Sequence, residues 1–120
     1  MEARAVSKYI RSSPRKMRIV ANVVREMPVT KALNTLHFMP NKAARFIERT
    51  IQSAVHNLMD VNADERVNEE ELVVRTIHVD QAPMFKRIQP VSRGRAHRIR
   101  KRNSHLTVVV GLPDAAEDDA

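Results

Sequence analysis

Hydrophobic residues in the first half of the chain recur with helical spacing, after a short segment that alternates. Residues 3–10 alternate weakly, with Val6 and Ile10 on one face, and this pattern predicts a brief strand. A helix is predicted from Pro14, because proline suits the first helical position and the Ser13 oxygen can accept a bond from an unpaired amide. The apolar face of this first helix consists of Met17, Val20, Ala21, Val24 and Met27.

Two further helices are predicted before the middle of the chain. Pro28 ends the first helix, and Thr30 can cap a short second one. After a break at residues 39–41, a third helix shows the strongest periodic signal and should end near Asp60. Its apolar stripe consists of Ala44, Ile47, Ile51, Ala54, Val55 and Leu58.

Two later segments are rich in β-branched residues and predict strands. They run from Leu72 to Val79 and from Leu106 to Val110, and we expect them to pair antiparallel. The symmetry of such a pair places the turn near Ser92 and Arg93, where Gly94 supplies a permissive backbone. The two strands are therefore expected to continue into a long hairpin.

The stretch that forms this hairpin is strongly basic. From Met84 to His105 the chain holds eight basic residues and no acidic one. We expect the hairpin to span residues 83–104 and to project about 30 Å, at roughly 3.3 Å per residue. Like charges on a projecting arm repel one another, so a phosphate backbone is the natural counter-charge. The basic residues are Lys86, Arg87, Arg93, Arg95, Arg98, Arg100, Lys101 and Arg102.

Composition narrows the classes of function. Lys and Arg number 21 against 14 Asp and Glu, a net charge of +7, which favours nucleic acid over a membrane surface as partner. Without Cys the chain has no disulfide, thiolate zinc site or Cys nucleophile, and 2 Gly cannot build a glycine-rich phosphate loop. The histidines are scattered and the consecutive Glu69–Glu71 diverge in direction, so we predict no metal, no cofactor and no catalytic residue. Aromatic residues make up only 3%, so recognition is expected to rest on shape and phosphates.

Acidic residues gather in two other places. Residues 60–71 contain six acids against one base, and this connection should be solvated and turned away from a polyanion.

We expect one domain over residues 1–113 and a disordered acidic tail over residues 114–120. No secretory signal and no run of about 20 apolar residues is present, so we expect a soluble, cytoplasmic protein.

Short motifs carry a resemblance to a known family. Lys86-Arg87-Ile88, followed by GRAHRIRKRNSHLTVVV from Gly94 to Val110, resembles the bacterial large-subunit ribosomal protein twenty-two family. Lys8-Tyr9-Ile10, the run Ser13 to Lys16, and Ala43-Ala44 are similar to that family as well. The resemblance covers roughly residues 3–111, but Glu26-Met27-Pro28 stands where the family commonly has a glycine-containing turn.

The resemblance implies both a fold and a function. The implied fold is α+β, with three helices packed on a small three-stranded antiparallel sheet and a long protruding basic β-hairpin. The implied protein is a non-enzymatic structural constituent of the large ribosomal subunit, which binds large-subunit (23S) rRNA as a monomer and bridges its segments during assembly. RNA-binding residues would be the basic residues of the hairpin and Arg11, Ser13, Arg15, Lys16 and Arg18.

The resemblance also assigns a role to the tip of the hairpin. The tip would line the nascent-peptide exit tunnel opposite large-subunit protein four and beside the nascent peptide, and no membrane partner is expected. Its residues would be Gln89, Pro90, Val91, Ser92, Arg93 and Gly94.

The residues alone are also compatible with two other functions. An architectural DNA-binding protein that bends duplexes with a basic β-ribbon also needs Arg and Pro on an arm. A hydrolase built on Glu69–Glu71 is the third reading. Competition between duplex DNA and folded rRNA at equal salt separates the first two classes, because binding to RNA depends on its tertiary shape.

Overall fold

The helices and strands follow one another in the order that the spacing of apolar residues predicts. The computed structural model describes the backbone of residues 2–62, 68–90 and 96–112, and the side chains of these residues except 84–90 and 96–101. Within this part of the chain the elements are β1 (Glu2–Ile10), α1 (Pro14–Val24), α2 (Val29–Phe38), α3 (Lys42–Val61), the short 3-10 helix η1 (Glu69–Glu71), β2 (Val73–Pro90) and β3 (Ala96–Gly111).

The three strands form an antiparallel sheet in the order β1-β3-β2, with β3 in the centre. Val79 lies opposite Leu106, which confirms the predicted pairing of the two β-branched segments. β2 is an edge strand, and it contains both Pro83 and Pro90. An edge strand tolerates proline, which has no amide hydrogen to donate. The register shifts just after Ala82, so a bulge marks the root of the hairpin.

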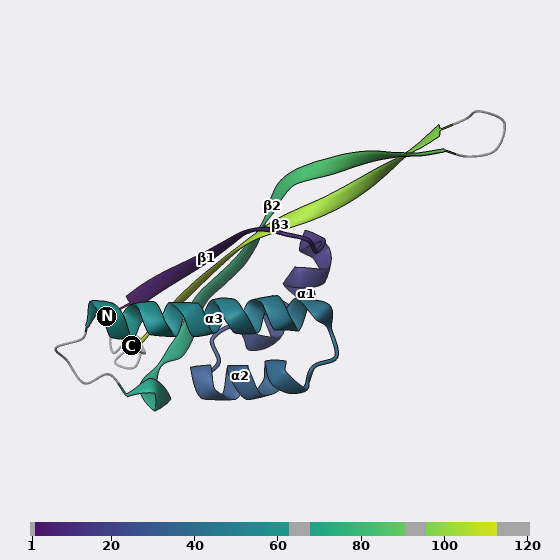
Figure 1. The fold of residues 1–120 in the computed structure, drawn as a ribbon. Coiled ribbons are helices and arrows are strands. Elements are labelled where there is room, and N and C mark those ends of the chain that lie inside the picture. Colours follow the sequence, from purple (N-terminus) through teal and green to yellow (C-terminus); the bar gives the residue numbers. More distant parts are fainter. Residues whose placement is uncertain (1, 63–67, 91–95, 113–120) are drawn as a thin grey trace, which may run out of the picture.

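The helices cover one face of the sheet and leave the other face open (Figure 1). In β3, Leu106 and Val108 are buried beneath the helices, whereas His105 and Thr107 are partly exposed on the open face. This alternation is what a sheet buried on one side requires. The largest fully buried side chains of the core include Met17, Leu36, Ile47, Ile51, Leu58, Leu72, Ile77 and Leu106.

β2 and β3 continue past the helices as a two-stranded hairpin (Figure 1). Their pairing extends to Pro90 and Ala96, and the turn expected near residues 92–94 lies outside the described residues. The molecule measures 66 × 28 × 24 Å, and its radius of gyration is 17.9 Å. A compact chain of 120 residues would have a radius of gyration of about 14 Å, and the hairpin explains the excess. The predicted α+β fold with a protruding hairpin is confirmed.

β1 departs from the predicted alternation at Val6. This residue is 43% exposed, whereas Ala5 and Ile10 are buried. Positions 5 and 10 are an odd number of residues apart, so they can share a face only if the strand is irregular between them. The register indeed shifts between Ser7 and Ile10. The expectation that Val6 lies on the same face as Ile10 is therefore wrong, because one extra residue is inserted in the strand.

The start of α1 agrees with the prediction, and the start of α2 does not. Ser13 Oγ accepts a hydrogen bond of 3.3 Å from the backbone amide three residues later, which confirms it as the cap of α1. α2 begins at Val29 with Pro28 at the N-cap, so Thr30 is not the cap. The Val29 amide donates to the Leu72 carbonyl at 2.9 Å. This contact with the chain before β2 fixes where α2 begins.

Candidate nucleic-acid interface

A cleft of about 590 Å³ lies where the end of β1, the first turns of α1 and α3, and the root of the hairpin meet. Among the described residues that line it are four cationic side chains, from Arg11, Lys16, Lys42 and Arg102, and no acidic one. The uncompensated positive charge makes the cleft a candidate site for an anion. The rest of the lining consists of Ser12, Ser13, Ile19, Asn41 and Ala43.

Two helix N-termini border the same cleft. The first amides of a helix lack helical partners and give this end a partial positive charge, which favours anions and disfavours cations by about 0.3–1 kcal/mol. The first turns of α1 and α3 nevertheless contain no acidic residue, and they carry Arg15, Lys16 and Lys42. Asn41, the N-cap of α3, makes no side-chain capping bond. Phosphate is the anion that such an arrangement of amides and cations binds well.

Hydrogen bonds of buried side chains hold the walls of the cleft in place. Ser104 of β3 is fully buried, and its Oγ donates to the Ser12 carbonyl at 2.7 Å. The neighbouring Asn103 is also fully buried, and its Nδ2 donates to the Pro83 carbonyl at 3.0 Å across the bulge of β2. Arg102 precedes these two anchored residues directly. The backbone that carries Arg102 is thus fixed both to the loop before α1 and to β2.

Two basic residues, Arg18 in α1 and Arg25 directly after its end, make contacts within the protein. Arg18 donates from Nε and Nη2 to the Val79 carbonyl, at 3.2 Å and 2.9 Å. Arg25 donates from Nη2 to the Ile77 carbonyl at 2.7 Å. Both carbonyls belong to the edge strand β2. Arg18, which the resemblance assigns to RNA, therefore also ties α1 to the sheet.

The structure brings together some of the residues expected to bind RNA. Four of them line the cleft, namely Arg11, Ser13, Lys16 and Arg102. Arg15 is exposed in the first turn of α1 but does not line the cleft. The backbone of the hairpin places seven further candidates in its two strands, and their side chains lie outside the described part: Lys86, Arg87, Gln89, Pro90, Arg98, Arg100 and Lys101. Five candidates lie outside the described residues altogether: Val91, Ser92, Arg93, Gly94 and Arg95.

Sequence reasoning missed the contribution of α3 to the cleft. Lys42 and Asn41 line it, and so does Ser12 from the loop before α1. One local signal was available in the sequence, namely a cation and no acid in the first turn of α3. The helix dipole disfavours a cation at this end, and an external anion would offset that cost. The meeting of the two helix starts is a tertiary contact, however, and the spacing of residues does not reveal it.

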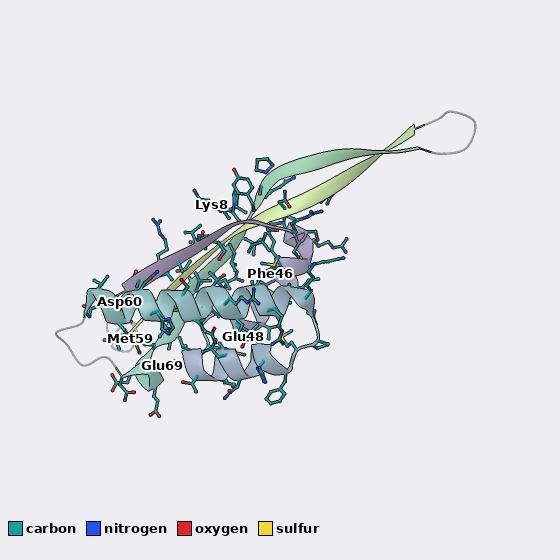
Figure 2. The ribbon with its side chains drawn as sticks, viewed as in Figure 1. Lys8, Phe46, Glu48, Met59, Asp60 and Glu69 are labelled. Carbon is teal, nitrogen blue, oxygen red and sulfur yellow. The ribbon has the colours of Figure 1, made fainter. Side chains whose placement is uncertain are left out.

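Acidic residues gather at the opposite end of α3. Figure 2 shows Asp60 and Glu69 at the end of the molecule away from the hairpin. α3 has 20 residues, so its two ends are separated by about 30 Å. The three glutamates of η1 are exposed. The charge of the protein is thus lopsided, as the sequence predicts, with its cationic cleft at one end of α3 and these carboxylates at the other.

Among the described residues, no group of three or more histidine or carboxylate side chains is arranged to hold a metal ion. No helix in the same part of the chain is long and apolar enough to span a membrane.

Together the fold and the cleft define a class of protein: a small α+β nucleic-acid-binding protein with a cationic cleft at the foot of a basic hairpin. Sequence comparison identifies the family within this class. The family model described as ribosomal protein L22p/L17e matches residues 5–111. The chain belongs to this family, which confirms the resemblance seen in its motifs.

Curated relatives support the assignment over nearly the whole chain. The large ribosomal subunit protein uL22 of Chloroflexus aggregans is 53% identical over 110 residues, which cover 92% of this chain and 95% of that one. The protein of the same name from Salinibacter ruber is 49% identical over 120 residues, covering 100% and 98% of the two chains. That of Chlorobaculum tepidum is 47% identical over 110 residues, covering 92% of each.

Proposed function

We propose that the chain is a structural constituent of the large ribosomal subunit and binds the rRNA of that subunit through the cleft and the hairpin. Family membership over residues 5–111 carries the proposal, together with relatives named as large ribosomal subunit proteins. Members of this family are structural and have no catalytic step, and in bacteria they work in the cytoplasm. The DNA-bending and hydrolase alternatives have no support from the family.

The cleft supplies side chains and helix N-termini that can bind the phosphates of rRNA. Four cations and two helix N-termini face one space, which suits the closely spaced phosphates of folded RNA. Each neutralised phosphate releases counterions, so the logarithm of the binding constant should fall with log salt by about 0.7–0.9 per contact. Arg11 and Arg102 add guanidinium groups that can donate two parallel bonds to one phosphate.

The hairpin supplies a second RNA-binding segment at a distance from the cleft. Its register places Lys86 opposite Arg100, and like charges at one register position destabilise a sheet. A two-stranded ribbon is also marginally stable in water by itself. Surrounding rRNA would neutralise the like charges and stabilise the two-stranded ribbon. Because the molecule is 66 Å long, one monomer could bridge rRNA segments that lie far apart.

The resemblance supplies the rest of the proposal. The tip, Gln89 to Gly94, would line the nascent-peptide exit tunnel beside large-subunit protein four and the nascent peptide. The length and narrowness of the hairpin support this role, since a two-stranded ribbon can pass between RNA helices that would exclude a globular domain.

A gentle purification tests the ribosomal role. The protein would be isolated from lysed cells in moderate salt, and the nucleic acid protected with it would be sequenced. We expect a few discrete segments of large-subunit rRNA, and cosedimentation with the large subunit. Protected genomic DNA without subunit association would overturn the proposal in favour of the DNA-bending alternative.

Charge-matched variants test the cleft. Lys16→Gln combined with Lys42→Gln removes two cleft cations, and Lys31→Gln combined with Arg49→Gln removes two exposed cations outside it. We expect the cleft variant to bind rRNA more weakly, with a salt slope lower by about two. The control should keep a slope close to that of the wild type. Equal losses in both variants would mean that the cleft has no special role.

A further inference from the structure

The irregularity in β1 places an aromatic residue in an unusual conformation. Ser7 pairs with Leu106 and Ile10 with Ser104, so the two residues between them on β1 face the single His105 on β3. Within this bulge Tyr9 has a φ of 56°. A positive φ is a genuine outlier for a bulky residue, and such outliers are concentrated at functional sites.

His105 holds Tyr9 in this position through two contacts. The Tyr9 amide donates to His105 Nδ1 at 3.1 Å. The two rings form an edge-to-face pair, with centroids 4.7 Å apart and an interplanar angle of 86°. In such a pair the edge of one ring meets the face of the other, so Tyr9 keeps at least one ring face free of His105. Tyr9 is 56% exposed, so much of this residue is accessible to a ligand.

The surroundings of the pair favour a phosphate-bearing ligand. Tyr9 and His105 lie on strands whose outer side no helix covers (Figure 1). Lys8, next to Tyr9, is exposed and lies on the side of the sheet away from the helices (Figure 2). From Ala3 to Arg25 the chain contains no acidic residue. The nearest acid by register is Asp80, which lies opposite His105 on β2, the strand on the far side from β1.

We propose that Tyr9 and His105 form a stacking site for an unpaired nucleobase of RNA, with the phosphate of that nucleotide beside Lys8. This inference rests on the proposed function, since it takes RNA as the partner. It adds a second mode of recognition to the phosphate contacts of the cleft. The low aromatic content of the sequence argues against a stacking surface, but pairing of β1 with β3 brings the ring of the single tyrosine against the imidazole ring of His105. Stacking on an aromatic ring tolerates any base and strengthens binding of unpaired RNA.

The intrinsic fluorescence of Tyr9 can be used to test this site. Tyr9 is the single tyrosine and the chain has no tryptophan, so intrinsic tyrosine fluorescence reports this ring alone. The full chain would be titrated with a single-stranded oligoadenylate and with an abasic oligomer of the same length. We expect the oligoadenylate to quench the emission and the abasic oligomer to leave it nearly unchanged. Equal responses to the two oligomers would overturn the stacking site.

Variants test the same site on rRNA. Tyr9→Phe keeps the ring, whereas Tyr9→Gly removes it and accepts the positive φ without strain. We expect Tyr9→Gly to weaken binding of an rRNA transcript by roughly 5- to 150-fold, the range for loss of one stacked base, with the salt slope unchanged. Tyr9→Phe should bind close to the wild type. Glu26→Gly, at the other positive-φ residue of the described chain, makes the same backbone change away from the site and serves as control.

The outcomes separate this inference from the proposed function. If the wild type binds rRNA with strong salt dependence and folded Tyr9→Gly binds it equally well, the stacking site is wrong and RNA binding stands. The open face of the sheet would then be available to a protein neighbour in the subunit. If the wild type does not bind rRNA, the proposed function fails and the stacking site fails with it. An unfolding curve for each variant confirms that it is folded.

Discussion

Ser104 Oγ donates a hydrogen bond of 2.7 Å to the carbonyl oxygen of Ser12, a residue 92 positions earlier in the chain. The bond joins the central strand of the sheet to the loop that leads into α1. Since Arg102 and Arg11 lie close to its two ends in sequence, the same bond fixes two walls of the cationic cleft relative to each other.

Ser104→Ala tests this relationship. The substitution leaves the Ser12 carbonyl without this donor in a partly buried position, and we expect the free energy of unfolding to fall by about 1–2 kcal/mol in urea titration. Ser53→Ala, on the exposed side of α3, should change it by no more than about 0.5 kcal/mol. Equal effects of the two changes would show that the bond contributes nothing to stability.

Arg45 gives a second prediction, because its guanidinium caps the end of α2. Nη2 donates to the carbonyls of Leu36, His37 and Met39 at 2.6–2.9 Å, and Nη1 donates to Glu48. Glu48 projects from α3 on the side toward α2 (Figure 2). Lysine keeps the charge but lacks this fork, so Arg45→Lys should lower the free energy of unfolding by about 1–2 kcal/mol.

Arg49 provides the control for that substitution. It lies one helical turn further along α3 and is exposed. Arg49→Lys should leave the urea midpoint almost unchanged. A midpoint for Arg45→Lys equal to that of Arg49→Lys would contradict the capping role.

Lys42→Glu should change stability and RNA binding in opposite directions. An acidic residue in the first turn of α3 suits the helix dipole, so we expect a gain of about 0.3–1 kcal/mol in the free energy of unfolding. The same change places a negative charge in the cleft and should weaken binding to rRNA. Urea titration and filter binding measure the two effects.

Lys31→Glu is the matched control, because Lys31 lies in the first turn of α2 and does not line the cleft. It should give a similar gain in stability with a much smaller loss of affinity. If both variants lost affinity equally, net charge rather than the cleft would govern binding.

Glu26→Gly should stabilise the protein. Glu26 has a φ of 64°, where an L-residue other than glycine is disfavoured by about 1–2 kcal/mol. Its amide donates to the Val74 carbonyl at 3.0 Å, which holds the backbone in this conformation. The larger entropy of glycine in the unfolded chain offsets part of the gain, so we expect an increase of about 0.5–1 kcal/mol. A lower thermal midpoint for the variant would contradict this reasoning.

Trimming the hairpin should separate folding from RNA binding. The buried cluster of the core uses β2 only as far as Val79 and β3 only from Leu106. Replacing residues 86–100 with an Asn-Gly turn, which joins the paired residues Phe85 and Lys101 and keeps Arg102 in the cleft, should therefore leave thermal unfolding cooperative. We expect weaker rRNA binding and a shallower salt dependence, because the basic arm is gone. Full affinity with an unchanged salt slope would show that the arm does not contact RNA.

The sequence by itself determined the elements, the pairing of the two β-branched segments, the basic hairpin and the class of partner. These features depend on the period of apolar residues, on capping residues such as Ser13 and on local charge density, all of which act between near neighbours. The family motifs add the subunit role, and the family model matches residues 5–111, which contain them.

Only the tertiary structure decided how these parts work together. The cleft needs the starts of α1 and α3 to meet, and Arg18 is held by a carbonyl of Val79, 61 positions further along. The ring pair of Tyr9 and His105 joins residues 96 positions apart and depends on one inserted residue in β1. Contacts of this kind follow from packing and strand register, which the periodicity of a single segment does not reveal. A bulge, for example, moves a side chain to the other face of the sheet without changing the local sequence pattern.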